Sequence, residues 1–160
     1  MDMIVQNDFN DMLRVFNEEN VQYLVVGGFA AILHGYERLT KDIDLLVWPN
    51  KENSVRVMAA LEKFGAPTHD VSAEDFETEG TVFQIGVQPI RIDIITQIIE
   101  INFEEAYKNV QIIEINGLKI PLISIPDLIK NKRAAGRPRD LNDAEHLEVI
   151  LKKKSQAGAR

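Results

Sequence analysis

VVGGFAAILHGYERLTKDIDLLV, residues 25–47, contains the most informative pattern in this chain. It predicts a buried strand, a tight turn at Gly27 and Gly28, a short helix, a loop, and a second strand that begins at Asp42. Side chains two positions apart on a strand point to the same face, so we expect Asp42 and Asp44 to lie side by side. Two adjacent carboxylates repel each other unless a cation lies between them, and oxygen ligands of this kind suit Mg²⁺.

The glycine pair adds a second expected binding feature. Glycine allows the backbone to approach a ligand closely, and the helix that follows would offer free N–H groups to a phosphate. The simpler interpretation is that Gly27 and Gly28 only form the turn. For Asp42 and Asp44 the simpler interpretation is a solvated surface turn, but the apolar positions 45–47 favour the start of a buried strand. A phosphate-binding turn beside paired carboxylates favours chemistry on a nucleotide.

Another acidic residue lies within a later predicted strand. In IRIDII, residues 90–95, Asp93 stands between isoleucines, and alternation places Arg91, Asp93 and Ile95 on one face. A lone carboxylate would be costly to bury there. Two interpretations remain open: Asp93 completes a metal-binding set with the earlier acidic pair, or it forms an ion pair with Arg91 or Lys41.

Gly-Gly, a helix, Asp-x-Asp on the next strand and a later acidic residue together resemble the polymerase-beta-like nucleotidyltransferase superfamily. More narrowly, GYERLTKDID at residues 35–44 and KRAAGRPRD at residues 132–140 look like small bacterial nucleotidyltransferases related to abortive-infection toxin and antitoxin enzymes. The resemblance covers about residues 21–151. It implies an α/β (α+β) nucleotidyltransferase fold, in which helices flank a mixed β-sheet.

The resemblance also implies an activity and the residues that carry it. Asp42, Asp44 and Asp93 would bind two Mg²⁺ ions, with Mn²⁺ as an alternative, and Asp93 would accept a proton from the attacking hydroxyl. An NMP would pass from an NTP, with ATP as the default, to an unknown RNA, protein or small-molecule acceptor, and pyrophosphate would leave. The nucleotide-binding residues that the resemblance implies are Gly27, Gly28, Arg38, Thr40 and Lys132.

Basic residues cluster late in the chain, at Lys130, Lys132, Arg133, Arg137 and Arg139. They would complement helix-end carbonyls as solvated side chains, or Lys132 or Arg133 would contact the triphosphate or an acidic acceptor. Arg38 is likewise either a phosphate or base contact or a surface side chain that balances nearby acids. A nucleic-acid-binding module would rest on this cluster alone.

A function of another class also remains open. The alternative is a non-catalytic binding protein that keeps the fold, such as one protein partner in a toxin–antitoxin pair. All three acidic residues are present, which favours an enzyme because binding alone would not need them. Residues 29–31 are Phe-Ala-Ala, where tRNA-end-adding nucleotidyltransferases and poly(A) polymerases have Arg-Asp, so CCA addition and templated polymerisation are not expected.

Length and composition narrow the class of protein. The 160 residues predict a single domain, 1–160, with a core at about 21–122 and C-terminal helices at about 124–153. A net charge of −7 argues against a general nucleic-acid binder, and the lack of cysteine excludes disulfides and thiolate chemistry. The three histidines lack zinc-ligand spacing. Neither a membrane-spanning apolar run nor a signal-peptide pattern is visible, so we expect a cytoplasmic protein.

Hydrophobic periodicity and turn residues predict the remaining elements. Helices are expected at residues 7–20, 29–34, 50–64, 102–109, 126–135 and 140–153, with a helical turn begun by Ser72 and Asp75. Strands are expected at 21–26, 42–47, 81–87, 90–96, 110–115 and 118–122, with connections at 88–89 and 116–117. The tail at 155–160 is expected to fray. The expected inward residues are Phe9, Met12, Leu13, Phe16, Val55, Met58, Leu61, Phe64, Leu141, Leu147 and Ile150.

Overall fold

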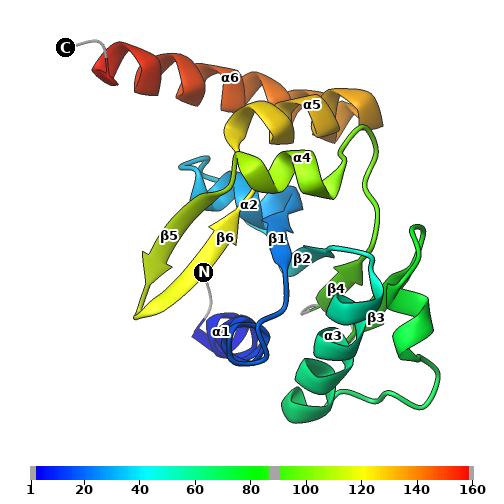
Figure 1. Cartoon of the computed structure of the whole chain (residues 1–160). Coiled ribbons are helices and arrows are strands. Elements are labelled where there is room, and N and C mark those ends of the chain that lie inside the picture. Colours follow the sequence, from blue (N-terminus) through cyan, green and yellow to red (C-terminus); the bar gives the residue numbers. More distant parts are fainter. Residues whose placement is uncertain (1–2, 87–90, 159–160) are drawn as a thin grey trace.

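The computed structural model describes residues 3–86 and 91–158. Within these residues six strands form one sheet in the order β3-β4-β2-β1-β6-β5, with helices packed around it (Figure 1). The strands are β1 (Tyr23–Val26), β2 (Asp42–Val47), β3 (Val82–Ile85), β4 (Arg91–Ile95), β5 (Gln111–Ile115) and β6 (Leu118–Leu122). The helices are α1 (Met3–Glu18), α2 (Gly27–Leu33), α3 (Lys51–Phe64), α4 (Phe103–Lys108), α5 (Ile125–Ala135), α6 (Pro138–Gly158) and the 3₁₀ helix η1 (Ala73–Phe76). Parallel and antiparallel pairs both occur, which confirms the predicted mixed sheet with flanking helices.

Strand β2 lies in the interior of the sheet, and its pairing with the neighbouring strands sets the positions of its polar residues. It pairs antiparallel with β1 and parallel with β4. In the β2–β4 register Asp42 lies opposite Arg91, and Asp44 lies opposite Asp93. These four side chains line one pocket, whereas Ile43 is fully buried on the other face of the strand. The predicted faces of the two strands are therefore confirmed.

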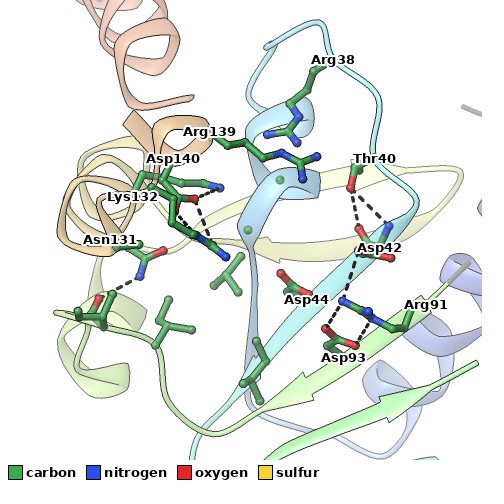
Figure 2. A pocket seen from close by; sticks show the side chains of 18 residues that line it. Arg38, Thr40, Asp42, Asp44, Arg91, Asp93, Asn131, Lys132, Arg139 and Asp140 are labelled. Carbon is green, nitrogen blue, oxygen red and sulfur yellow. Dashed lines mark hydrogen bonds and ion pairs between the residues drawn. The ribbon is translucent and has the colours of Figure 1, made fainter. Parts of the chain in front are cut away.

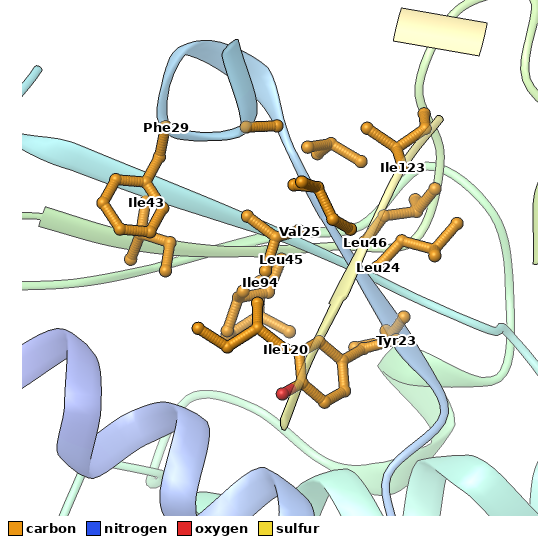
Figure 3. Packing of buried hydrophobic residues seen from close by; sticks show 14 of the residues in the cluster. Tyr23, Leu24, Val25, Phe29, Ile43, Leu45, Leu46, Ile94, Ile120 and Ile123 are labelled. Carbon is orange, nitrogen blue, oxygen red and sulfur yellow. The ribbon is translucent and has the colours of Figure 1, made fainter. Parts of the chain in front are cut away.

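The apolar face of α1 forms one side of the core. The predicted residues of this face are all buried, namely Phe9, Met12, Leu13 and Phe16. Phe9 packs edge-to-face on Phe29 of α2, with ring centroids 5.4 Å apart. Phe16 packs in the same way on Tyr23 of β1, at 5.1 Å. Apolar side chains from the central strands and from the other helices complete the core (Figure 3).

Capping residues fix the ends of α3 and α5. The side chains of Asn50 and Ser124 accept hydrogen bonds from backbone N–H groups in the first turns of these helices. Gly65 and Gly136 end the helices in the left-handed conformation, with φ of 90° and 71°. The predicted bounds of both helices are confirmed to within one residue.

Turn residues behave as their sequence predicts. Asn116 and Gly117 join β5 to β6 with φ of 53° and 81°, the pair of positive values that a type I′ hairpin turn requires. Ser72 and Asp75 form a capping box at η1. The predicted connection at residues 88–89 lies outside the described residues.

The inward face of α3 differs from the prediction. Val55 is 61% exposed, so its predicted inward position is wrong. Asn53 is fully buried instead, and its side chain accepts a hydrogen bond from Gln22 N at 2.7 Å. The same side chain donates to Gln22 O and Trp48 O, both at 3.0 Å, so the need to satisfy buried backbone groups sets the rotation of the helix. The inward apolar residues are Val57, Ala60 and Leu61, with Met58 and Phe64 partly buried.

Helix α6 extends beyond its predicted ends. It begins at Pro138, where a missing N–H is tolerated because the first turn leaves that group unpaired. It continues to Gly158, so the frayed tail predicted from residue 155 is wrong for positions 155–158, while positions 159–160 lie outside the described residues. No helix in the described ranges is long and apolar enough to cross a membrane.

The inner face of α6 is also more polar than predicted. Leu141 is 45% exposed, so its predicted inward position is wrong. Asp140 and Asp143 take the inner face because they pair with basic residues of neighbouring elements. Leu147 is buried and Ile150 is partly buried, as predicted.

We predict that Asn53→Ala lowers the free energy of unfolding by about 2–4 kcal/mol, because it removes three hydrogen bonds and leaves Gln22 N without its partner, whereas Gln22 O and Trp48 O still accept from Trp48 N and Asn50 N. Val55→Ala on the same helix should change it by no more than about 0.5 kcal/mol, because Val55 is exposed. Urea denaturation followed by circular dichroism measures both. Equal effects of the two substitutions would contradict this account of α3.

Candidate active site

A pocket of about 510 Å³ lies at the end of the sheet where β1 meets α2, between the strands β2 and β4 on one side and α5 with the start of α6 on the other (Figure 2). The structure brings all of the sequence-predicted site residues to its lining: Gly27, Gly28, Arg38, Thr40, Asp42, Asp44, Asp93 and Lys132. They come from five different parts of the chain, the β1–α2 turn, the loop before β2, β2, β4 and α5. The sequence therefore identified residues that the fold places together.

Three carboxylates form the acidic side of the pocket. Asp42 and Asp44 project from β2, and Asp93 lies directly opposite Asp44 on β4. Burial, together with the neighbouring charges of Asp93 and Asp42, raises the pKa of Asp44 to about 6. Thr40 helps to fix the start of β2, because its hydroxyl accepts a hydrogen bond from Asp42 N at 3.4 Å.

Arg91, on β4, lies among these carboxylates, opposite Asp42 of β2. Its Nε is 3.0 Å from Asp93 Oδ1, and its second guanidinium nitrogen, Nη2, is 3.3 Å from Asp93 Oδ2. The same Nη2 is 3.5 Å from Asp42 Oδ2. The ion pair between Arg91 and Asp93, one of the two open interpretations of Asp93, is therefore present. It does not exclude the other interpretation, because Asp93 still lines the pocket with the acidic pair.

Gly27 and Gly28 differ in how strictly the site requires them. Gly27 has a φ of 71°, and a Cβ built on it would overlap the carboxylate of Asp44. A Cβ built on Gly28 would lie 3.5 Å from the Arg38 guanidinium, which is an ordinary contact. The close approach of backbone to carboxylate therefore requires glycine at position 27 alone.

The basic side of the pocket is held by two buried aspartates that sequence reasoning did not select. Asp143 is almost fully buried, and its Oδ2 accepts from Arg38 Nη1 at 2.5 Å and lies 3.0 Å from Lys132 Nζ. Arg38 does balance a nearby acid, as the simpler interpretation predicted, but it is only 12% exposed and is therefore not a surface side chain. The signal for these aspartates was their spacing with Ala144 and Leu147, which matches one helix face.

Asp140, the second buried aspartate, extends this network to Arg137. Its Oδ2 accepts from Arg137 Nε at 2.6 Å, and its Oδ1 is 3.6 Å from Lys132 Nζ. Burial alone would raise the pKa of Asp140, but the hydrogen bond from Arg137 and the charge of Lys132 hold it below its ordinary value.

The predicted basic cluster is divided between two surfaces. Lys132, Arg137 and Arg139 line the pocket. Arg133 instead forms an ion pair with Glu148 at 2.6 Å, and with Lys130 it lines a separate surface depression between α5 and α6. Contact of Arg133 with a ligand in this pocket is therefore not supported by its position.

The acidic side chains are of the type that binds a divalent cation, but they do not surround a common position for one. Among the described residues no three His, Cys, Asp or Glu side chains form a metal-binding group, and Arg91 lies between Asp42 and Asp93. Asp42 Oδ1 is buried and has no hydrogen-bond partner within the same residues. An unpaired carboxylate oxygen and a carboxyl group with a raised pKa both indicate negative charge that the site does not fully neutralise. The donor set therefore fits Mg²⁺ or Mn²⁺ if Arg91 moves.

A mixed sheet that carries acidic residues on adjacent strands beside a glycine turn defines the class of nucleotidyltransferase folds. The chain belongs to the family described as nucleotidyltransferase of unknown function (DUF6036), whose model matches residues 4–154. No match was found among the curated proteins.

Solved structures share this fold at low sequence identity. The antibiotic-resistance factor ANT(2″)-Ia is 18% identical, with 99% of this chain and 96% of that chain covered and a TM-score of 0.60. The lincosamide antibiotic adenylyltransferase LnuA is 18% identical, with 90% and 96% covered and a TM-score of 0.59. An antigenic nucleotidyltransferase-like protein from Paracoccidioides brasiliensis is 17% identical, with 87% and 71% covered and a TM-score of 0.57.

We predict that Gly27→Ala lowers the free energy of unfolding by about 1–3 kcal/mol, because alanine must adopt a positive φ and displace the Asp44 carboxylate. Gly28→Ala is the matched control in the same helix, and it should change stability by less than about 1 kcal/mol. Thermal denaturation of both variants measures this difference. Equal destabilisation would show that the contact with Asp44 is not the constraint.

The raised pKa of Asp44 predicts an unusual dependence of stability on pH without metal. The folded-state pKa of about 6 exceeds the ordinary value of 3.8, so the native state binds more protons, and stability falls as pH rises from about 4 to 6. Asp44→Asn removes this loss and should raise the free energy of unfolding at pH 7.5 by up to about 3 kcal/mol.

Urea denaturation in a chelating buffer at pH 4.5 and 7.5 tests the Asp44 prediction. The gain from Asp44→Asn should be larger at the higher pH. A gain that is the same at both pH values would contradict the raised pKa.

Proposed function

We propose that this protein is a Mg²⁺-dependent enzyme that transfers an NMP from an NTP, with ATP as the default, to a hydroxyl group of an acceptor. The observation that carries the proposal is the convergence of Asp42, Asp44 and Asp93 in one pocket that basic side chains complete. A metal–triphosphate complex contains both cations and anions, so it suits a pocket with carboxylates on one side and guanidinium and ammonium groups on the other.

The three carboxylates would hold the metal ions in this proposal. Bound Mg²⁺ would supply charge neutralisation and lower the pKa of the acceptor hydroxyl. The hydroxyl oxygen would form a bond to the α-phosphorus while the bond from that phosphorus to the pyrophosphate oxygen breaks. Asp93 would accept the hydroxyl proton, and the β- and γ-phosphates would leave as pyrophosphate.

The basic residues would bind and orient the phosphates. Arg38 and Lys132 both contact Asp143 Oδ2, so each is held in place before any ligand arrives. Arg139 also reaches into the pocket, near α2 (Figure 2). Gly27 and Gly28 would let the triphosphate lie close to the backbone.

Support for the acceptor class comes from the pocket and from similar structures. LnuA has been solved with lincomycin bound, and ANT(2″)-Ia in complex with adenylyl-2″-tobramycin. Beside the carboxylates, the pocket is lined by Ile95, Ile98 and Ile99, which offer an apolar surface for a base or for an acceptor. Asn131 lies in the same lining. Among the predicted acceptor classes of RNA, protein and small molecules, we therefore include small molecules of this kind in the test.

The likeness to abortive-infection toxin and antitoxin enzymes stays a prediction, as does the alternative of partner binding without turnover. The single-domain organisation is likewise proposed. It is supported by contacts of α2 with both α5 and α6, which join the C-terminal helices to the sheet.

Label transfer tests the proposed activity. The purified protein would be incubated with Mg²⁺, each of the four α-labelled NTPs, and either cell lysate or aminoglycoside and lincosamide antibiotics. We expect the label to enter one acceptor class, and we expect Asp44→Asn to lower transfer by at least about 100-fold. Val55→Ala, which lies on an exposed face of α3, serves as the control with unchanged transfer.

Each outcome of this assay bears on the proposal. γ-Labelled ATP should give labelled pyrophosphate and no labelled acceptor, which separates NMP transfer from phosphoryl transfer. Full transfer by the Asp44→Asn variant would contradict the assignment of these carboxylates to the active site. No transfer with any NTP would instead favour the partner-binding alternative, and proteins that co-purify with the chain would then be identified.

A further inference from the structure

Arg91 already supplies a positive charge inside the acidic side of the pocket. Its guanidinium bridges Asp93 on its own strand and Asp42 on β2, at 3.0 Å and 3.5 Å. These two residues are two of the three proposed metal ligands, and the oxygens that Arg91 contacts are Asp93 Oδ1, Asp93 Oδ2 and Asp42 Oδ2. The same oxygens cannot bind Arg91 and a metal ion in full at the same time.

Arg91 neutralises the acidic side only in part. Asp42 Oδ1 remains buried without a hydrogen-bond partner in the described part of the chain, and Asp44 forms no ion pair there. A guanidinium carries one positive charge, whereas a divalent cation carries two in a smaller volume and accepts oxygens from several directions. A divalent cation can therefore satisfy carboxylate oxygens that Arg91 leaves unpaired.

The position of Arg91 would allow it to leave. Its side chain is 29% exposed, compared with 10% for Lys132. Lys132 contacts two buried aspartates, whereas Arg91 lines the pocket and contacts Asp42, which is 33% exposed, as well as Asp93 (Figure 2). A change of rotamer would bring the guanidinium into the space of the pocket without any movement of β4.

We propose that Arg91 is a resident counter-ion that a divalent metal ion must displace from Asp42 and Asp93. This inference rests on the proposed function, because it assigns the metal to the same carboxylates. In the absence of metal, Arg91 holds the strands β2 and β4 together at their acidic positions. When a metal binds, Arg91 swings into the pocket, where its guanidinium is available to a phosphate group. It is a positioning residue whose release couples metal binding to the arrangement of the pocket.

The alternative is that Arg91 stays in place and orients the carboxylates for the metal. The two roles predict opposite changes in metal affinity. If Arg91 competes, its removal strengthens metal binding. If Arg91 orients the ligands, its removal weakens metal binding.

Mn²⁺ binding to the full chain, without nucleotide, distinguishes these roles. Free Mn²⁺ would be measured by electron paramagnetic resonance for the wild type, Arg91→Met, Arg139→Met and Asp44→Asn. Arg139→Met is the matched control, because it also removes one arginine charge from the pocket lining but contacts none of the three carboxylates. Arg91→Gln, which keeps hydrogen-bond donors, provides a second variant if Arg91→Met unfolds.

We expect Arg91→Met to bind Mn²⁺ about tenfold or more tightly relative to both the wild type and Arg139→Met, because charge-assisted hydrogen bonds no longer compete. Arg91→Gln should fall between the wild type and Arg91→Met. In a chelating buffer Arg91→Met should melt at a lower temperature than the wild type, and Mn²⁺ should raise its melting temperature by a larger interval. Asp44→Asn should bind Mn²⁺ weakly.

Failure of this inference differs from failure of the proposed function. If Arg91→Met binds Mn²⁺ no more tightly than Arg139→Met while Asp44→Asn loses binding, the displacement role is overturned and the metal site stands. If none of the proteins binds Mn²⁺, or if Asp44→Asn binds it as well as the wild type, the proposed metal site fails and the role of Arg91 fails with it.

Discussion

The parallel pairing of β2 with β4 is the constraint on which the rest of the site depends. It places Asp44 opposite Asp93, with Asp42 two positions away on the same face, so three carboxylates meet in a half-buried place. Their mutual repulsion and burial favour protonation, as the raised pKa of Asp44 shows. The positive charges of Lys132 and Arg91 oppose this repulsion, Arg91 by direct contact with Asp93 and Lys132 from α5, where Asp140 and Asp143 hold it.

Local chemistry in the sequence was sufficient to predict most of the fold and the acidic part of the site. The alternation of side chains on a strand requires only a period of two, so Asp42 could be assigned to the same face as Asp44 before any contact was known, whereas the resemblance to a known superfamily was needed to join Asp93 to them. Caps such as Asn50 and Ser124 act within three residues of their own position. The ends of α3 and α5, which these caps fix, were therefore predicted to within one residue, whereas the predicted helices 7–20 and 140–153 differ from α1 and α6 by up to four and five residues at their ends.

Long-range polar contacts explain what the sequence could not show. Asn53 sets the rotation of α3 about its axis, because its side chain forms hydrogen bonds with backbone groups that lie as far as 31 positions away in the chain. Asp140 and Asp143 set the rotation of α6 in the same way, because they pair with basic residues of other elements. A hydrophobic pattern would place Asn53, Asp140 and Asp143 on the solvent side of their helices, although all three are buried. Lys132 and Arg133 are neighbours in sequence but point to different surfaces, since adjacent positions on a helix differ by about 100° in direction.

The separation of charge across the pocket has a consequence for how a ligand would enter. Carboxylates project from the sheet, whereas Arg38, Lys132 and Arg139 approach from the loop before β2 and from the C-terminal helices (Figure 2). Opposite charges on two sides of a partly enclosed space create an electric field directed from the helices toward the sheet. A molecule with separated positive and negative groups would be rotated by that field before it touched either side, so the direction of entry is selected ahead of contact.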